Sequence, residues 1–139
     1  MHRLLFGIGL SAFSAACATA PATDVSGTWD WQETISTASG LACEATGQLL
    51  LAQFADNNRF TGQRSRMGTC TGAPTGFTVD GGQGLIGAQL VGSDVSFEID
   101  FCNYVGVLTG SDEMNGTVVC PDGVGQVQEA IEGTWSASR

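Results

Sequence analysis

The side chains that most often perform catalysis are scarce in this sequence. His2 is the only histidine and lies near the N-terminus, and the chain contains no lysine. A Ser-His-Asp arrangement, a Cys-His arrangement and a Schiff-base lysine are therefore excluded once the N-terminal segment is removed. The chemistry that remains is that of paired carboxylates, as in glycoside hydrolases, with Glu98 and Asp100 or Asp112 and Glu113 as the pairs. Because neighbouring acids in polar segments are usually surface or turn residues, we expect a protein that is not an enzyme and carries no metal or cofactor.

The few positive charges point to anion binding instead. The formal net charge is −9 at pH 7, and Arg64 and Arg66 lie close together in a β-rich run. A guanidinium binds a carboxylate or phosphate through paired hydrogen bonds, so both arginines are candidate ligand-binding residues. The alternative is that they only offset nearby acids. The acidic balance argues against nucleic acid and anionic membrane surfaces as partners, because both require a basic patch.

The N-terminus has the pattern of an export signal. Arg3 precedes an apolar run over residues 4–13, which is too short to span a bilayer, and small residues then lead to Cys17. The segment 14–17 resembles a bacterial lipobox, although Ser14 replaces the usual leucine. It predicts a signal peptide over 1–16, an acylated Cys17 and a tether over 17–24, and hence a lipoprotein facing the periplasm or the cell surface. The alternative is cleavage after residues 20–22, which would yield a secreted or periplasmic protein.

Four further cysteines are expected to pair in an oxidising compartment. Cys43 and Cys70 lie symmetrically about the turn signal at residues 56–57, and Cys102 and Cys120 lie symmetrically about residues 110–112. Directly opposed residues in a hairpin have this symmetry, so the sequence predicts the disulfides Cys43–Cys70 and Cys102–Cys120. In a meander, all four cysteines would lie at the same end, in the connections that follow alternate strands.

The rest of the chain has the pattern of one all-β domain. Val95, Phe97, Ile99 and Phe101 alternate with polar residues, which places one face of that run in a core. Turn residues separate the strand signals, and no stretch has a helical period. We expect eight strands, over residues 27–34, 46–54, 59–66, 85–91, 94–101, 104–109, 114–119 and 131–138. This spacing is typical of a sandwich or an up-and-down barrel.

Both ends of this domain carry the sequence Gly-Thr-Trp, at residues 27–29 and 133–135. The pattern of Gly27 and Trp29 at the start with Arg139 at the end resembles the calycin group, which includes lipocalin-like barrels. The segments 47–53, 104–110 and 114–117 look like hairpins of small bacterial lipocalin-like domains. The resemblance implies an eight-stranded antiparallel up-and-down barrel over residues 25–139, in which Arg139 stacks on Trp29 and closes the end opposite the disulfides.

A ligand would be expected in the mouth of such a barrel. The long connection over residues 68–84 and the shorter one over 121–130 both fall at the cysteine end. The ligand-binding candidates are Trp31, Arg64, Arg66, Phe97 and Tyr104. We expect a small, partly apolar or amphipathic ligand. The alternative is a filled barrel that binds another protein in the cell envelope, as a protease inhibitor does. Inward glycines would leave room for a ligand, with Gly62, Gly106 and Gly116 as candidates.

Overall fold

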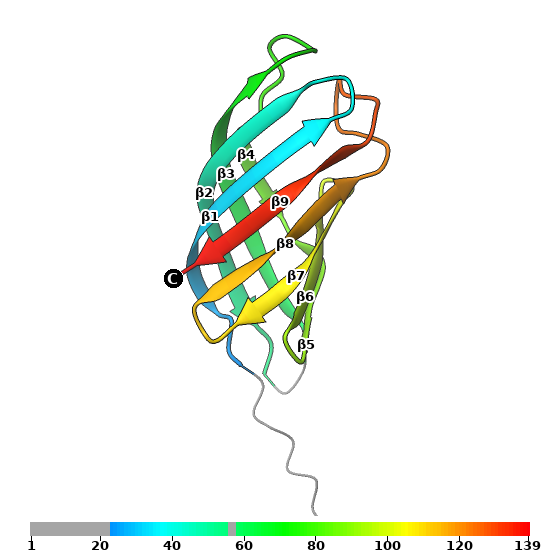
Figure 1. Ribbon diagram of the computed structural model, residues 1–139. Coiled ribbons are helices and arrows are strands. Elements are labelled where there is room, and N and C mark those ends of the chain that lie inside the picture. Colours follow the sequence, from blue (N-terminus) through cyan, green and yellow to red (C-terminus); the bar gives the residue numbers. More distant parts are fainter. Residues whose placement is uncertain (1–22, 56–57) are drawn as a thin grey trace, which may run out of the picture.

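The protein folds into a nearly closed antiparallel β-barrel (Figure 1). The computed structural model describes residues 23–55 and 58–139. Its sheet has the order β4-β3-β2-β1-β9-β8-β7-β6-β5. The strands are β1 (Gly27–Thr37), β2 (Ala42–Gln53), β3 (Phe60–Thr71), β4 (Gly81–Gly84), β5 (Ile86–Val91), β6 (Asp94–Ile99), β7 (Cys102–Thr109), β8 (Glu113–Cys120) and β9 (Ile131–Ser138).

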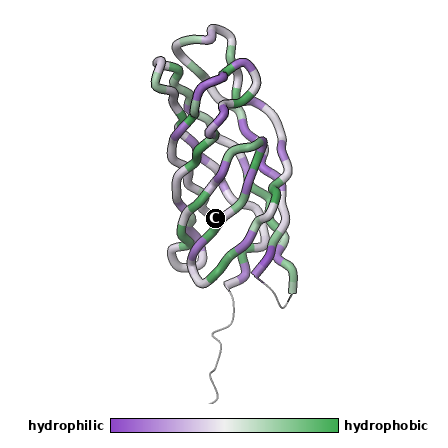
Figure 2. The backbone as a smooth tube through the Cα atoms, turned by 90° about the vertical axis from the view of Figure 1, so that its right-hand side faces the viewer, coloured by the Kyte–Doolittle hydropathy of each residue, from purple (hydrophilic) through white to green (hydrophobic). Residues whose placement is uncertain are grey.

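Alternation of side chains along the strands builds the interior. In β1, Trp29, Trp31, Glu33 and Ile35 are buried, and the residues between them are exposed. Hydrophobic and hydrophilic residues likewise alternate along the tube in Figure 2. This period of two places one face of each strand inside the barrel and the other in water. The first and last strands are paired along most of their length, from Asp30 opposite Ser138 to Thr37 opposite Ile131.

The seam of the barrel lies between β3 and β5. An isolated bridge joins Arg59 to Gln89, and the backbone N–H groups of Leu90 and Leu85 donate to the carbonyls of Asn58 and Gly62. Further along β3 the short β4 pairs with Gln63–Arg66 instead. The seam is therefore closed at one end of the barrel, and β4 forms the sheet edge near the other end.

Within residues 23–55 and 58–139 the chain forms nine strands, where the sequence predicts eight. The additional strand is β4, whose four residues Gly-Gly-Gln-Gly are all exposed and carry no apolar alternation. Its backbone pairs with β3 although its side chains give no strand signal. The predicted connection over residues 68–84 is correspondingly shorter, because β3 continues to Thr71. Phe101 also departs from expectation: β6 ends at Ile99, and Phe101 lies in the following turn with 78% of its surface exposed.

Both disulfides join the pairs that hairpin symmetry predicts, Cys43 with Cys70 and Cys102 with Cys120. Cys43 lies directly opposite Cys70 in the β2–β3 ladder. The expected placement of the cysteines in connections is wrong, because β2, β3, β7 and β8 are longer than their apolar signals and include the cysteines. The turn signal at residues 56–57 lies outside the described residues.

The opposite end of the barrel is closed by Arg139. Its guanidinium lies 4.3 Å from the centroid of the Trp29 ring. It also donates hydrogen bonds to the backbone carbonyls of Asp24, Ser26 and Ser111. Gly27, at the start of β1, lies beside the same guanidinium. A Cβ added at Gly27 would lie 3.6 Å from Nη1 of Arg139. One side chain thus connects the segment before β1, the β7–β8 turn and the end of β9.

Aromatic rings fill the middle of the barrel. Trp31 stacks on Trp135 with ring centroids 5.1 Å apart, and Phe97 stacks on Tyr104 at 5.0 Å. Gly106 does not leave open space, because a Cβ there would lie 2.8 Å from Cζ2 of Trp135. A Cβ on Gly116 would lie 1.9 Å from the carbonyl oxygen of Val105. These glycines therefore allow close approach of ring and backbone rather than creating a cavity, contrary to expectation.

The expected signal peptide, the acylated Cys17 and most of the tether lie outside the described residues. Within residues 23–55 and 58–139, no helix is long and apolar enough to cross a membrane.

Candidate functional site

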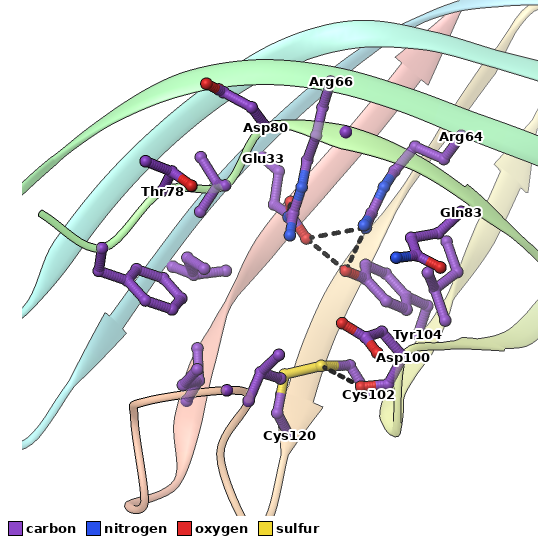
Figure 3. A pocket seen from close by; sticks show the side chains of 18 residues that line it. Glu33, Arg64, Arg66, Thr78, Asp80, Gln83, Asp100, Cys102, Tyr104 and Cys120 are labelled. Carbon is purple, nitrogen blue, oxygen red and sulfur yellow. Dashed lines mark hydrogen bonds and ion pairs between the residues drawn. A yellow bond between two sulfur atoms is a disulfide. The ribbon is translucent and has the colours of Figure 1, made fainter.

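A pocket of about 220 Å³ opens at the disulfide end of the barrel (Figure 3). Its walls come from strands β1, β3, β6, β7, β8 and β9, from the β6–β7 turn, from the segment 77–83 and from residues 124–125. The apolar part of the wall includes Ile35, Phe77, Val79, Ile99, Val124, Ile131 and the Cys102–Cys120 disulfide. The polar side chains in the wall are Glu33, Arg64, Arg66, Thr78, Asp80, Gln83, Asp100 and Tyr104.

Four of these polar side chains converge at one side of the pocket, and we call them the polar cluster: Glu33, Arg64, Arg66 and Tyr104 (Figure 3). The hydroxyl of Tyr104 donates to Oε1 of Glu33 at 2.6 Å and accepts from Nη1 of Arg64 at 2.5 Å. Arg64 Nη1 lies 3.6 Å from the same Glu33 oxygen, and Arg66 Nη1 forms an ion pair with Oε2. One carboxylate thus connects two strands that are not neighbours, because β1 supplies Glu33 and β7 supplies Tyr104.

Burial makes this cluster unlike the charges on the surface. Glu33 and Arg64 are the buried charged residues of the described chain, with side chains 1% and 2% exposed. Arg66 is more accessible, at 17%. Buried charges are costly unless they are paired and hydrogen-bonded, and the cluster meets this requirement for Glu33. Among the described residues, the Nε–H of Arg64 is a buried donor without a hydrogen-bond partner.

Tyr104 stays protonated in this environment. Burial raises the pKa of Tyr104 above its usual value, and the neighbouring Glu33 carboxylate raises it further. The neutral phenol can therefore donate to Glu33 and accept from Arg64 at the same time. The Tyr104 ring also stacks on Phe97, which fixes it above the aromatic core. The packed rings of the aromatic core therefore support the polar cluster on the side away from the pocket opening.

The rim of the pocket is formed by two loops and a tight turn. Phe77 and Val79 pack against the core from the loop before β4, and Val124 does so from the connection over residues 121–130. Asp100 and Phe101 form the two-residue β6–β7 turn with φ of 52° and 65°. Positive φ at both positions is the geometry of a type I′ hairpin, and it is strained for a bulky residue such as phenylalanine. The turn sets Asp100 at the pocket rim and directs Phe101 into solvent.

The structure divides the predicted ligand-binding residues into two groups. Arg64, Arg66 and Tyr104 line the pocket. Trp31 and Phe97 do not, because they belong to the aromatic core, and the Trp31 ring lies 5.7 Å from the guanidinium carbon of Arg64. Glu33 is the residue that sequence reasoning missed. Its position two residues beyond Trp31 on the inward face of β1 is a signal that could have identified it.

The carboxylate pairs considered for catalysis do not form a common site. Asp112 and Glu113 are exposed at the far end of the barrel, where Asp112 lies 3.8 Å from Nε of Arg139. Asp100 is on the pocket rim, whereas Glu98 lies outside the residues that line this pocket. In the part of the chain that the structure describes, no group of three or more His, Cys, Asp or Glu side chains could hold a metal ion.

Fold and pocket together define a nearly closed antiparallel β-barrel with a small, partly polar cavity at one mouth. Neither a protein-family model nor a curated protein sequence matches the chain. A solved structure that does match is that of EF1p2_mFAP2b bound to DFHBI, with a TM-score of 0.50 and 13% sequence identity. The match covers 83% of this chain and 93% of that chain. At this identity the likeness concerns the fold, and it supports the barrel architecture.

Proposed function

We propose that this protein is an exported β-barrel that binds a small, partly apolar molecule in the pocket at its disulfide end and does so without catalysis. The observation that carries the proposal is that a single pocket has both apolar walls and the buried polar cluster. Binding pockets in proteins are usually apolar with a few well-placed polar groups that orient the ligand. The structural neighbour, solved with DFHBI bound, shows that a barrel of similar fold accepts a small molecule.

The volume of the pocket limits the size of the ligand. An apolar cavity of about 150 Å³ holds benzene, so about 220 Å³ suits a molecule of about nine non-hydrogen atoms. This is below the size of most drug-like ligands. The aromatic core below Tyr104 prevents a longer molecule from entering the middle of the barrel.

Export and lipid anchoring belong to the same proposal. Two disulfides are typical of proteins from oxidising compartments, which supports export. The lipobox-like segment before Cys17 supports attachment to a membrane through an acyl chain. Such an anchor would hold a small binding domain at the cell envelope.

A variant in which a larger side chain fills the pocket tests the binding function. Indole has a suitable size, carries no charge and can be followed by ligand-observed NMR. We expect it to bind the wild-type protein and to lose binding in Thr78→Trp, because Thr78 lines the pocket and a larger side chain would occupy it. Thr75→Trp is the matched control, since Thr75 is exposed in the same loop and does not line the pocket. Absence of indole binding, or equal binding by both variants, would contradict a ligand site in this pocket.

Protein interaction is the second candidate function, and one observation favours it. Phe101 and Met67 are 78% and 75% exposed, and each lies within three residues of a disulfide cysteine. Large exposed apolar side chains near one end can contact a partner. Inhibition of secreted proteases by the wild-type protein, lost in a Phe101→Ser/Met67→Ser variant, would support this function over small-molecule binding.

A further inference from the structure

The polar cluster carries an excess positive charge, and this property determines which ligands the proposed pocket can accept. Arg64 and Arg66 are both guanidinium ions, since arginine keeps its proton in proteins. Glu33 supplies one negative charge, and Tyr104 is neutral. The net charge of the four side chains is therefore one positive charge. At a site where Arg64 is 2% exposed, an uncompensated charge is poorly solvated and attracts an anion.

Hydrogen-bond donors of the same two arginines are unused. Arg64 lines the pocket, and its buried Nε–H has no partner among the described residues. Arg66 also lines the pocket, and within the described chain it donates one hydrogen bond, to Glu33. A guanidinium has five N–H donors in a planar fork that matches a carboxylate. Arg66 thus offers directional donors to a ligand, and both arginines offer positive charge.

The carboxylates at the rim do not cancel this charge. Asp80 and Asp100 line the opening but are exposed, so water screens them. Asp80 accepts a hydrogen bond from the backbone N–H of Gly68, and in Figure 3 its carboxylate points away from the polar cluster. The excess positive charge therefore acts in the buried part of the pocket, and the acids act at its entrance.

We infer that the ligand is a small organic monoanion of about nine non-hydrogen atoms, with a carboxylate that binds the guanidinium of Arg66 beside the buried charge of Arg64 and an apolar body that packs against Phe77, Ile99 and Ile131. This inference rests on the proposed binding function and adds the charge and the chemical class of the ligand. A monoanion matches the single excess charge, and the apolar walls favour an organic anion over an inorganic one.

Benzoate, benzamide and benzamidinium test the inference, because they have the same size and shape and differ in charge. Calorimetric titration of the full chain at neutral pH and low salt should show benzoate binding about tenfold or more tightly than benzamide. Benzamidinium should bind most weakly. Equal affinity for benzoate and benzamide, or tighter binding of benzamidinium, would overturn the anion assignment. If indole binds while none of the three does, the assignment is also wrong and the pocket function stands.

Variants of Arg66 separate anion recognition from packing. Arg66→Met should weaken benzoate binding about tenfold or more and so reduce the preference for benzoate over benzamide. Arg66→Lys keeps the charge and loses the planar fork, so its affinity for benzoate should be intermediate. Arg59→Met, at an exposed position outside the residues that line the pocket, is the control and should change neither the affinity for benzoate nor that for benzamide. Circular dichroism confirms that each variant is folded. Unchanged benzoate affinity in folded Arg66→Met would refute the assignment, whereas a protein that binds neither indole nor benzoate would refute the proposed function itself.

Discussion

Deleting Arg139 should open the end of the barrel that lies opposite the pocket. Its Nη1 donates to the carbonyl of Ser26 at 2.7 Å, and its Nη2 donates to Asp24 and Ser111 at 2.9 Å each. Its guanidinium also lies over the Trp29 ring at 4.3 Å. The deletion therefore removes contacts to residues 24–29 and to the β7–β8 turn while leaving the β1–β9 ladder in place.

The expected loss can be worked from these contacts. A cation–π contact contributes about 0.5–2 kcal/mol. The Arg139 side chain is 26% exposed, so each hydrogen bond to a carbonyl contributes about 0.5–1 kcal/mol, less than in a buried setting. Together these give a loss of about 3 kcal/mol, which lowers the Tm by about 10 °C for a domain of this size. Arg139→Lys keeps the charge over Trp29 but not the planar fork, and it should lose about half as much.

Thermal unfolding and tryptophan fluorescence measure both parts of this prediction. Trp29 is fully buried, and without Arg139 its emission should shift to the red as water reaches the ring. Trp31 and Trp135 lie deeper in the aromatic core and should keep their emission. Indole binding at the far mouth should be unchanged. An unaltered Tm and emission spectrum after the deletion would refute the role of Arg139 in closing the barrel.

Four further perturbations act on other parts of the molecule. Replacing Cys43 and Cys70 by alanine should lower the free energy of unfolding by about 3–4 kcal/mol, measured by urea denaturation, because the disulfide closes a long loop. Glu33→Gln leaves two arginines without their carboxylate and should cost about 3 kcal/mol; a loss below about 1 kcal/mol would contradict the buried ion pair. Since burial raises the pKa of Tyr104, the folded protein holds the phenol proton more tightly than the unfolded chain, so stability from this group is constant below about pH 10 and falls above it. Absorbance titration follows this group directly, because the chain has one tyrosine. Cys17→Ala should release the protein from the membrane fraction, and wild-type protein found in the soluble fraction would argue against acylation.

The features that the sequence predicts well are those that depend on period and symmetry. Alternation in β6 identifies Val95, Phe97 and Ile99 as inward residues, and all three are buried. Symmetry about a turn identifies the two disulfides, because opposed residues in a hairpin have a fixed relation along the chain. Both signals are local, so they require no knowledge of how distant strands meet.

The features that the sequence does not predict depend on contacts between distant strands. Glu33 is hydrogen-bonded to Tyr104, 71 positions further along the chain, and neither residue indicates the other locally. β4 is a strand because β3 offers its backbone an edge, not because of its own side chains. Phe101 fits the alternating pattern of β6 but lies in a type I′ turn, where the reversal of the chain overrides its preference for burial.

The interior of the barrel is filled at one level and contains a pocket at another, whereas the sequence presents a filled barrel and a ligand-binding barrel as alternatives. Around Gly106 and Gly116 the backbones approach closely and the Trp135 ring covers the space, so this level is filled. Two residues further along β1 from Trp31, the inward side chain is Glu33, and here polar groups replace rings and a pocket remains. The packed rings support the polar cluster from below, and the Arg139 contacts close the end beyond them. Arg139 and Arg66 lie at opposite ends of this stack, with a filled core between them. In a variant that combines both changes, the loss in free energy of unfolding should therefore equal the sum of the losses in the single variants, and so should the loss in free energy of ligand binding.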